Sequence, residues 1–172
     1  MMKTLGIVVS GFPGIGKSHF TANTKLKVSD SDSSQFDKSG FPRNYVDEIA
    51  RRRTEYDIVL VSSHEEVRAE LDRQKIPYQI VHPGHECKEE YLQRYRDRGN
   101  SDLFVSLLDK HWDHWIDGCL YDGSGDVNEL RSVNGYRLGS GRYLADVIPR
   151  IVEFETQRVA SAATTEHTKE KP

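Results

Sequence analysis

Cysteine and long apolar runs are both scarce in this chain, and each shortage excludes a class of protein. Cys87 and Cys119 are the only cysteines and lie outside any C-x-x-C spacing, so the sequence supports neither a disulfide framework nor a zinc site, and we expect free thiols. No segment approaches the roughly 20 apolar residues of a membrane span. The N-terminus runs directly into a predicted strand instead of a signal-peptide region. We therefore expect a cytoplasmic protein with no membrane partner.

An excess of one charge is also missing. The formal net charge is −3, which gives no global basic field, so nucleic acid is not the favoured partner. The 172 residues predict one domain, residues 1–158. Residues 159–172 are small, polar or charged and carry no apolar stripe, so they are predicted to form a disordered tail. A homo-oligomer stays compatible with the sequence.

A glycine-rich segment at residues 11–18, GFPGIGKS, matches the P-loop pattern G-x-x-x-x-G-K-[ST] directly after the apolar run of residues 5–9. Glycines lack a Cβ and let backbone N–H groups approach phosphate oxygens. Lys17 would place its charge on the β- and γ-phosphates, and the Ser18 hydroxyl is a hard oxygen ligand for Mg²⁺. The segment predicts binding of ATP with Mg²⁺. The predicted nucleotide contacts are Gly11, Gly14, Ile15, Gly16, Lys17, Ser18 and His19.

Apolar periodicity predicts alternating strands and helices, which favour a doubly wound parallel α/β sheet of the P-loop kinase type, with its ligand at the carboxyl ends of the strands. The glycine-rich residues 118–135 are expected to form a surface excursion. After the first strand, further strands are predicted at residues 26–29, 57–63, 77–82 and 136–138. Helices are predicted at residues 17–23, from residue 44, and at 65–75, 88–98, 103–116 and 143–154.

Phosphate binding alone does not separate kinases from GTPases and motor ATPases. The chain has no guanine-specific N-K-x-D segment, and the strand near residues 58–61 ends in Ser62-Ser63-His64 instead of an Asp-Glu pair that would hold Mg²⁺. Both observations weaken the GTPase and motor hypotheses. A phosphotransferase instead needs a carboxylate near the acceptor hydroxyl and cations around the transferring phosphoryl group.

Candidates for both kinds of group are present. Asp30 and Asp32 stand two residues apart after the second strand, so both carboxylates can face the cleft, with Asp32 also a candidate Mg²⁺ ligand. A solvated turn or a helix cap is the alternative interpretation of this pair. Arg94 and Arg98 share one helix face and could clamp phosphate, the alternative being a solvated basic surface.

Three further residues are candidates for binding the acceptor. Arg43 could hold an acceptor phosphate, and Ser62 and Ser63 follow the third strand at the same sheet edge. His111 and His114 lie three residues apart on an aromatic-rich helix and are interpreted as packing or surface residues, so no transition metal is assigned.

Together the segments GFPGIGKS, DSDSSQF, DIVLVSS, YQIVHP and EYLQRYRDRGN resemble small P-loop kinases of the nucleotide and nucleoside-monophosphate kinase superfamily, in particular compact (deoxy)nucleotide kinases of bacteriophages. The resemblance implies Mg²⁺-dependent transfer of the γ-phosphoryl group of ATP. It also implies a carboxylate role for Asp30 or Asp32 and a helical lid at about residues 86–101 that carries Arg94 and Arg98. The D-G-x-P-R segment typical of adenylate kinases is missing at the third strand.

Three functions remain open at this point. The first is a (deoxy)nucleoside monophosphate kinase with a nucleotide as its substrate. The second is a polynucleotide-kinase-like enzyme that phosphorylates a hydroxyl on DNA or RNA or on a modified base, because an aspartate after the second strand suits that chemistry too. The third is a nucleotide-binding regulatory protein without catalysis.

Overall fold

The centre of the protein is a sheet of five parallel strands in the order β2-β3-β1-β4-β5. The computed structural model describes residues 4–120 and 134–169. Strand β1 lies in the middle and pairs with β3 on one side and β4 on the other. All four pairings between neighbouring strands are parallel, so the predicted parallel α/β sheet is confirmed. The strands are β1 (Ile7–Gly11), β2 (Val28–Asp30), β3 (Ile58–Ser62), β4 (Tyr78–Pro83) and β5 (Asn134–Leu138).

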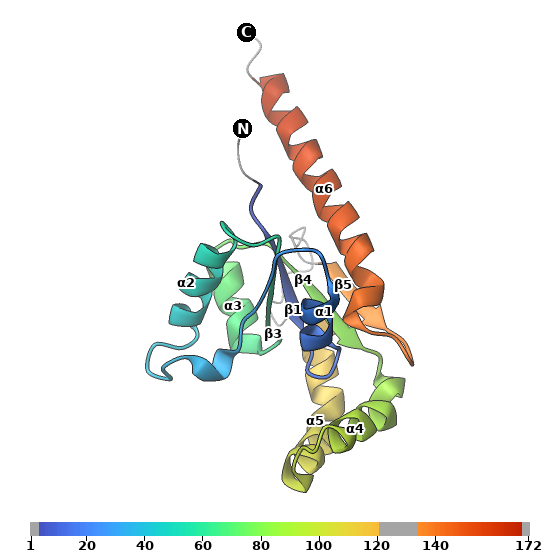
Figure 1. Ribbon diagram of the computed structural model, residues 1–172. Helices are drawn as coiled ribbons and strands as arrows, with labels where there is room; N and C mark the ends of the chain where they lie inside the picture. Colours follow the sequence, from blue (N-terminus) through green and yellow to red (C-terminus); the bar gives the residue numbers. More distant parts are fainter. Residues whose placement is uncertain (1–3, 121–133, 170–172) are drawn as a thin grey trace.

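Helices flank the sheet, with α2 packed on α3 and α1 packed on α6 (Figure 1). The central strands are covered on both faces, and Val59, Leu60 and Val61 of β3 are fully buried. Such continuous β-branched and aliphatic runs are typical of parallel strands between two helical layers. The helices are α1 (Lys17–Asn23), α2 (Arg43–Arg52), α3 (Glu65–Arg73), α4 (Lys88–Asp97), α5 (Asp102–Leu120) and α6 (Leu144–Lys169), with short 3₁₀ turns η1 (Ser33–Gln35) and η2 (His85–Cys87).

The second strand begins and ends later than predicted. Leu26 is exposed, and the parallel pairing with β3 starts only at Val28 opposite Ile58. The side chain of Asp57 instead accepts a hydrogen bond from the backbone N–H of Lys27 at 2.8 Å, before the ladder begins. Asp30 is therefore the last residue of the strand, directly at the carboxyl edge of the sheet.

Residues 159–169, which belong to the segment predicted as a disordered tail, lie in the continuation of α6. Figure 1 shows α6 extending well past the sheet. Ala160, Ala162 and Ala163 have high helix propensity, so the helix continues although the segment has no apolar stripe. In the predicted excursion, residues 118–120 end α5 and residues 134–135 begin β5, while residues 121–133 lie outside the described residues.

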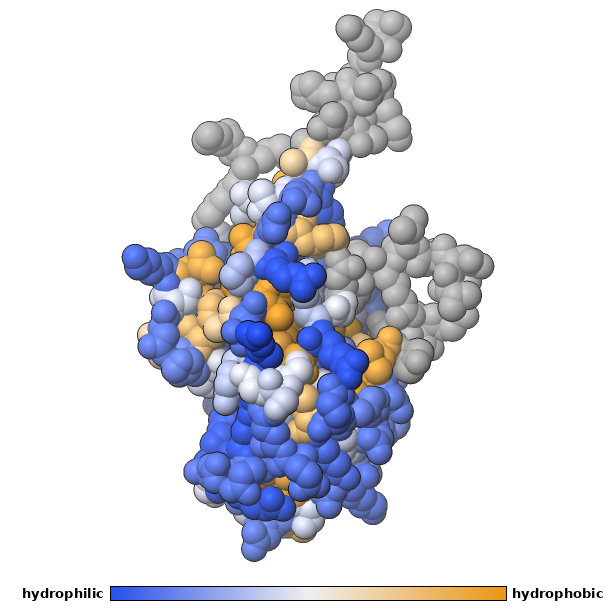
Figure 2. Space-filling model, turned by 90° about the vertical axis from the view of Figure 1, so that its right-hand side faces the viewer, coloured by the Kyte–Doolittle hydropathy of each residue, from blue (hydrophilic) through white to orange (hydrophobic). Residues whose placement is uncertain are grey.

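Helices α4 and α5 pack on each other beyond the carboxyl ends of the strands (Figure 1). Tyr91 of α4 lies 5.5 Å from Trp112 of α5 between ring centroids, and Phe12 contacts both rings edge-on. Figure 2 shows the surface of this lobe as mostly hydrophilic. Among the residues with described positions, no helix is both long and apolar enough to span a membrane. The lobe holds α4 above the loop that follows β1.

Candidate functional site

Residues 11–18, the glycine loop, connect β1 to α1 at the centre of the sheet. Gly14 has a φ of 82° and Gly16 a φ of 91°, values that residues with a Cβ rarely adopt. A Cβ on Gly14 would also lie 3.0 Å from the Tyr95 hydroxyl, and one on Gly16 would lie 3.2 Å from the Tyr143 ring. Both glycines are therefore required by the backbone conformation and by the neighbouring side chains.

Lys17 begins α1 and its Nζ donates a hydrogen bond to the Gly11 carbonyl at 2.6 Å. Burial lowers the pKa of Lys17, the carboxylates of Asp30 and Asp32 oppose this shift, and Arg98 adds to it. Two acidic groups and one further cation thus act on the lysine from other segments. The Lys17 ammonium group is therefore influenced by negative charge from two aspartates and by positive charge from one arginine.

The two aspartates differ in their surroundings. Asp30 lies 3.4 Å from the Ser18 Oγ, which donates to its carboxylate, so one hydroxyl and one carboxylate stand side by side next to Lys17. Asp32 accepts a hydrogen bond from the backbone N–H of Ser34 at 2.9 Å and caps η1, and this bond is the main reason that its pKa is lowered. The cap predicted as the alternative interpretation therefore applies to Asp32.

Tyr45 of α2 ties the ends of two strands together, and sequence reasoning missed it. Its hydroxyl donates to the Ser31 carbonyl at 2.8 Å and accepts from the Ser62 N–H at 3.1 Å. The Ser63 carbonyl accepts a hydrogen bond from the buried guanidinium of Arg68. The serines at the end of β3 are thus held through their backbone atoms.

Arg94 is fixed in place above the glycine loop. It donates to the Gly14 carbonyl at 3.1 Å and to the carboxylate of Glu90 on its own helix. Its guanidinium carbon also lies 4.4 Å from the Tyr91 ring centroid and 4.0 Å from that of Tyr143. A cation held by a carbonyl, a carboxylate and two aromatic faces attaches α4 to the loop.

The segment between β5 and α6 completes the cover of the glycine loop. The Leu144 N–H donates to the Ile15 carbonyl at 2.8 Å. Glu90 accepts from the Ser140 hydroxyl at 2.7 Å and from the Gly141 N–H at 3.1 Å. Glu90 was not predicted from the sequence, because its partners Ser140 and Gly141 lie about fifty positions away in the chain. Helix α4 and the segment between β5 and α6 therefore both contact the glycine loop or each other around residues 14–16.

The other predicted residues divide into two groups. Arg98 is exposed at the end of α4, yet it is close enough to Lys17 to lower that residue's pKa. Arg43 contributes to the low pKa of Glu70 on α3, about 2, whose main cause is the hydrogen bond from Arg73. His19 is exposed and has its Nδ1 3.5 Å from the Asn23 amide. Arg98 is thus brought to the glycine loop, whereas no described contact ties Arg43 or His19 to it.

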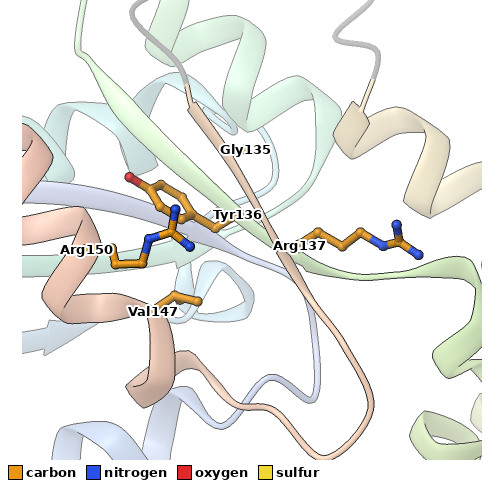
Figure 3. Close-up of a pocket in the computed structure, with 5 residues that line it drawn as sticks. All are labelled: Gly135, Tyr136, Arg137, Val147 and Arg150. Atoms are coloured by element: carbon orange, nitrogen blue, oxygen red, sulfur yellow. The ribbon is translucent and has the colours of Figure 1, made fainter.

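A separate cavity of about 300 Å³ lies between β5 and α6. Figure 3 shows Tyr136, Val147 and Arg150 gathered on one side of β5, while Arg137 extends toward the other side. Arg137 pairs there with Glu86 at 2.5 Å. None of the predicted site residues lines this cavity.

Two side chains near Lys17 carry oxygen atoms of the kind that bind Mg²⁺. Ser18 and Asp30 offer a hydroxyl and a carboxylate, which are hard oxygen donors, and Mg²⁺ commonly uses one or two protein ligands together with phosphate oxygens and water. Within residues 4–120 and 134–169 no group of three or more His, Cys, Asp or Glu side chains is arranged to hold a metal ion by itself. Cys87 and Cys119 are buried and free.

Comparison with known proteins adds little to this geometry. No protein-family model and no curated protein matches the chain. Among solved structures, an uncharacterized protein from Eubacterium ventriosum is similar, with a TM-score of 0.46 and 10% identity, over 88% of this chain and 98% of that one. The fold defines an α/β protein with a parallel five-stranded sheet flanked by helices.

Proposed function

We propose that the protein is a Mg²⁺- and ATP-dependent phosphotransferase that acts on a (deoxy)nucleoside monophosphate. One observation carries the proposal: an ammonium, a hydroxyl and a carboxylate from Lys17, Ser18 and Asp30 gather at a loop whose glycines take positive φ. Such a loop at the start of a helix favours a polyphosphate through its N–H groups and the helix dipole. The resemblance to small P-loop kinases supports the same function.

The charges suggest how the residues would divide the reaction. Lys17 and Arg98 would offset the charge that spreads over the terminal phosphoryl group as its bond to the β-phosphate oxygen breaks. The acceptor's phosphate oxygen would attack phosphorus without a general base, because a phosphate monoester has already lost its second proton near neutral pH. Ser18 and Asp30 would hold Mg²⁺, whose charge would neutralise part of the phosphate charge.

A coupled measurement of ADP release tests the proposal. Purified protein with MgATP is offered each ribo- and deoxyribonucleoside monophosphate in turn, a 5′-hydroxyl oligonucleotide, or no acceptor. We expect at least one monophosphate to stimulate ADP release, and Lys17→Ala to abolish this stimulation. Lys25→Ala is the matched control because it removes an exposed lysine just after α1. Circular dichroism verifies that both variants fold.

Other outcomes would decide between the alternative functions. Phosphate transferred only to the oligonucleotide would favour the polynucleotide-kinase-like enzyme. Binding of MgATP without turnover for any acceptor would favour the regulatory protein. If the protein binds no nucleoside triphosphate at all, the proposal is wrong.

A further inference from the structure

Four residues of α4 and its C-cap lie on one face of the helix. Tyr91, Arg94, Tyr95 and Arg98 are spaced at i, i+3, i+4 and i+7, which places them along a single stripe. Arg94 contacts Gly14 and Arg98 acts on Lys17, so this stripe faces the glycine loop. Figure 2 shows the outer surface of the α4 and α5 lobe as mostly hydrophilic, in contrast to the aromatic inner side.

Tyr91 and Tyr95 of the stripe both carry a buried hydroxyl without a hydrogen-bond partner among the described residues, and the hydroxyl of Tyr95 is the one that approaches Gly14. Only 4% of Tyr95 is exposed, and its ring lies 5.2 Å from that of Phe104 between centroids. Among the residues that the structure describes, its hydroxyl has no hydrogen-bond partner. A buried hydroxyl without a partner costs about 1–3 kcal/mol. Phenylalanine would keep the ring contacts and avoid this cost, so the packing of the lobe does not account for the hydroxyl.

The hydroxyl lies at the rim of the glycine loop. A Cβ built on Gly14 would be 3.0 Å from it, and the Arg98 guanidinium carbon is 5.8 Å from the Tyr95 ring centroid. Lys17 is expected to reach the β- and γ-phosphates, and Arg98 lies close enough to Lys17 to lower its pKa. Burial raises the pKa of Tyr95, so the hydroxyl keeps its proton and can donate.

We infer that the Tyr95 hydroxyl donates a hydrogen bond to the terminal phosphoryl group of a bound nucleoside triphosphate and so distinguishes a triphosphate from a diphosphate. The inference rests on the proposed function through its first step, triphosphate binding. A phosphate oxygen would supply the acceptor that the buried hydroxyl lacks, and hydrogen bonds to charged acceptors are stronger than neutral ones. Tyr95 is then a binding and specificity residue of the donor site.

Calorimetric titration with MgATP and MgADP tests the inference on wild type and Tyr95→Phe. We expect the variant to bind MgATP about 10- to 100-fold more weakly, the range for loss of one hydrogen bond to a charged group, and to bind MgADP as the wild type does. The empty variant should melt at the same temperature as the wild type or higher, because the unpartnered hydroxyl is gone. Tyr56→Phe is the control, since Tyr56 lies beside Gly6 at the amino ends of β1 and β3, away from the glycine loop that follows β1.

The outcomes separate this inference from the proposed function. If wild type binds MgATP and Tyr95→Phe binds it equally well, the inference is overturned and the proposed function stands. Equal weakening of MgATP and MgADP binding overturns it as well, because the hydroxyl would then act on the loop as a whole. If wild type binds neither nucleotide, both proposals are wrong.

Discussion

The two sides of the candidate site are built differently. On the donor side, the glycine loop is covered by α4 and by the segment before α6, with Arg94 and Glu90 each making several hydrogen bonds. On the acceptor side, the carboxylates of Asp30 and Asp32 are exposed, and Tyr45 fixes the strand ends through backbone atoms. The glycine loop is therefore held by contacts with other segments, whereas the side chains of Asp30 and Asp32 at the ends of the strands are exposed.

The largest expected effect comes from replacing the two aspartates of the acceptor side one at a time and comparing the loss of turnover. We expect Asp30→Asn to lower turnover by about 10–100-fold, the usual cost of a change at a metal site, because the carboxylate beside Ser18 would be lost. Asp32→Asn should cost much less, because Asp32 mainly caps η1 and asparagine retains an oxygen that can accept from Ser34 N–H. Turnover under saturating ATP and acceptor, measured for each variant beside wild type, checks the prediction.

Binding measurements serve as the control for this pair. Both variants should still bind MgATP within about tenfold of wild type, since Lys17 and the loop N–H groups are unchanged. A larger loss of turnover in Asp32→Asn than in Asp30→Asn would reverse the assignment of roles.

A second test addresses how tightly the donor side is packed, and it uses two glycines with the same backbone conformation. Gly14 and Gly99 have φ values of 82° and 76°, so alanine strains both by about 1–2 kcal/mol. Around Gly99 nothing lies within 4 Å of a built Cβ, whereas at Gly14 the Tyr95 and Tyr91 side chains stand at 3.0 and 3.2 Å. We expect Gly14→Ala to weaken MgATP binding by about tenfold or more and Gly99→Ala to leave it unchanged.

Thermal unfolding of the empty variants supplies the second readout. Gly14→Ala should melt at a lower temperature than Gly99→Ala, because only the former displaces buried rings. Equal melting temperatures and equal affinities would show that α4 does not press on the loop.

The same contrast explains what the sequence could predict. Residues 11–18 form a local motif between a strand and a helix, so its spacing alone predicts Lys17 and Ser18 as site residues, and apolar periodicity predicts most strands and helices. Glu90, Tyr45 and Tyr143 act on residues far away in the chain, and no local pattern marks them. Tyr95 is an intermediate case: the sequence analysis placed Arg94 and Arg98 on one helix face but did not identify Tyr95, which shares that face by its spacing.

The acceptor edge offers a third, smaller effect. Tyr45→Phe would remove the hydroxyl that joins Ser31 to Ser62 and would leave a buried carbonyl and an N–H without that partner. We expect a loss of about 1–3 kcal/mol in the free energy of unfolding, measured by urea denaturation. The KM for the acceptor should rise more than the KM for ATP, because the strand ends lie on the acceptor side. Equal changes in both would mean that Tyr45 supports the whole site instead of this edge.

The smallest expected effect is a fraction of a proton taken up when the polyphosphate binds. Burial lowers the pKa of Lys17 below its ordinary value of 10.5 in the empty protein, and a bound anion favours the charged form, so the pKa rises on binding. As pH rises through the lowered pKa, MgATP affinity should therefore fall. Over the window between the lowered pKa and 10.5 the unfolded chain holds more protons at this residue than the folded one, so the contribution of Lys17 to stability rises with pH.

Titration calorimetry in buffers of different ionisation enthalpy, over a series of alkaline pH values, measures this proton uptake directly. Lys17→Arg is the matched variant, because a guanidinium stays charged throughout the range and should bind without uptake. Uptake of the same size in Lys17→Arg would assign the proton to another group. It would also mean that the donor side is not organised around a partly desolvated ammonium, which is the feature that most clearly distinguishes it from the exposed carboxylates on the acceptor side.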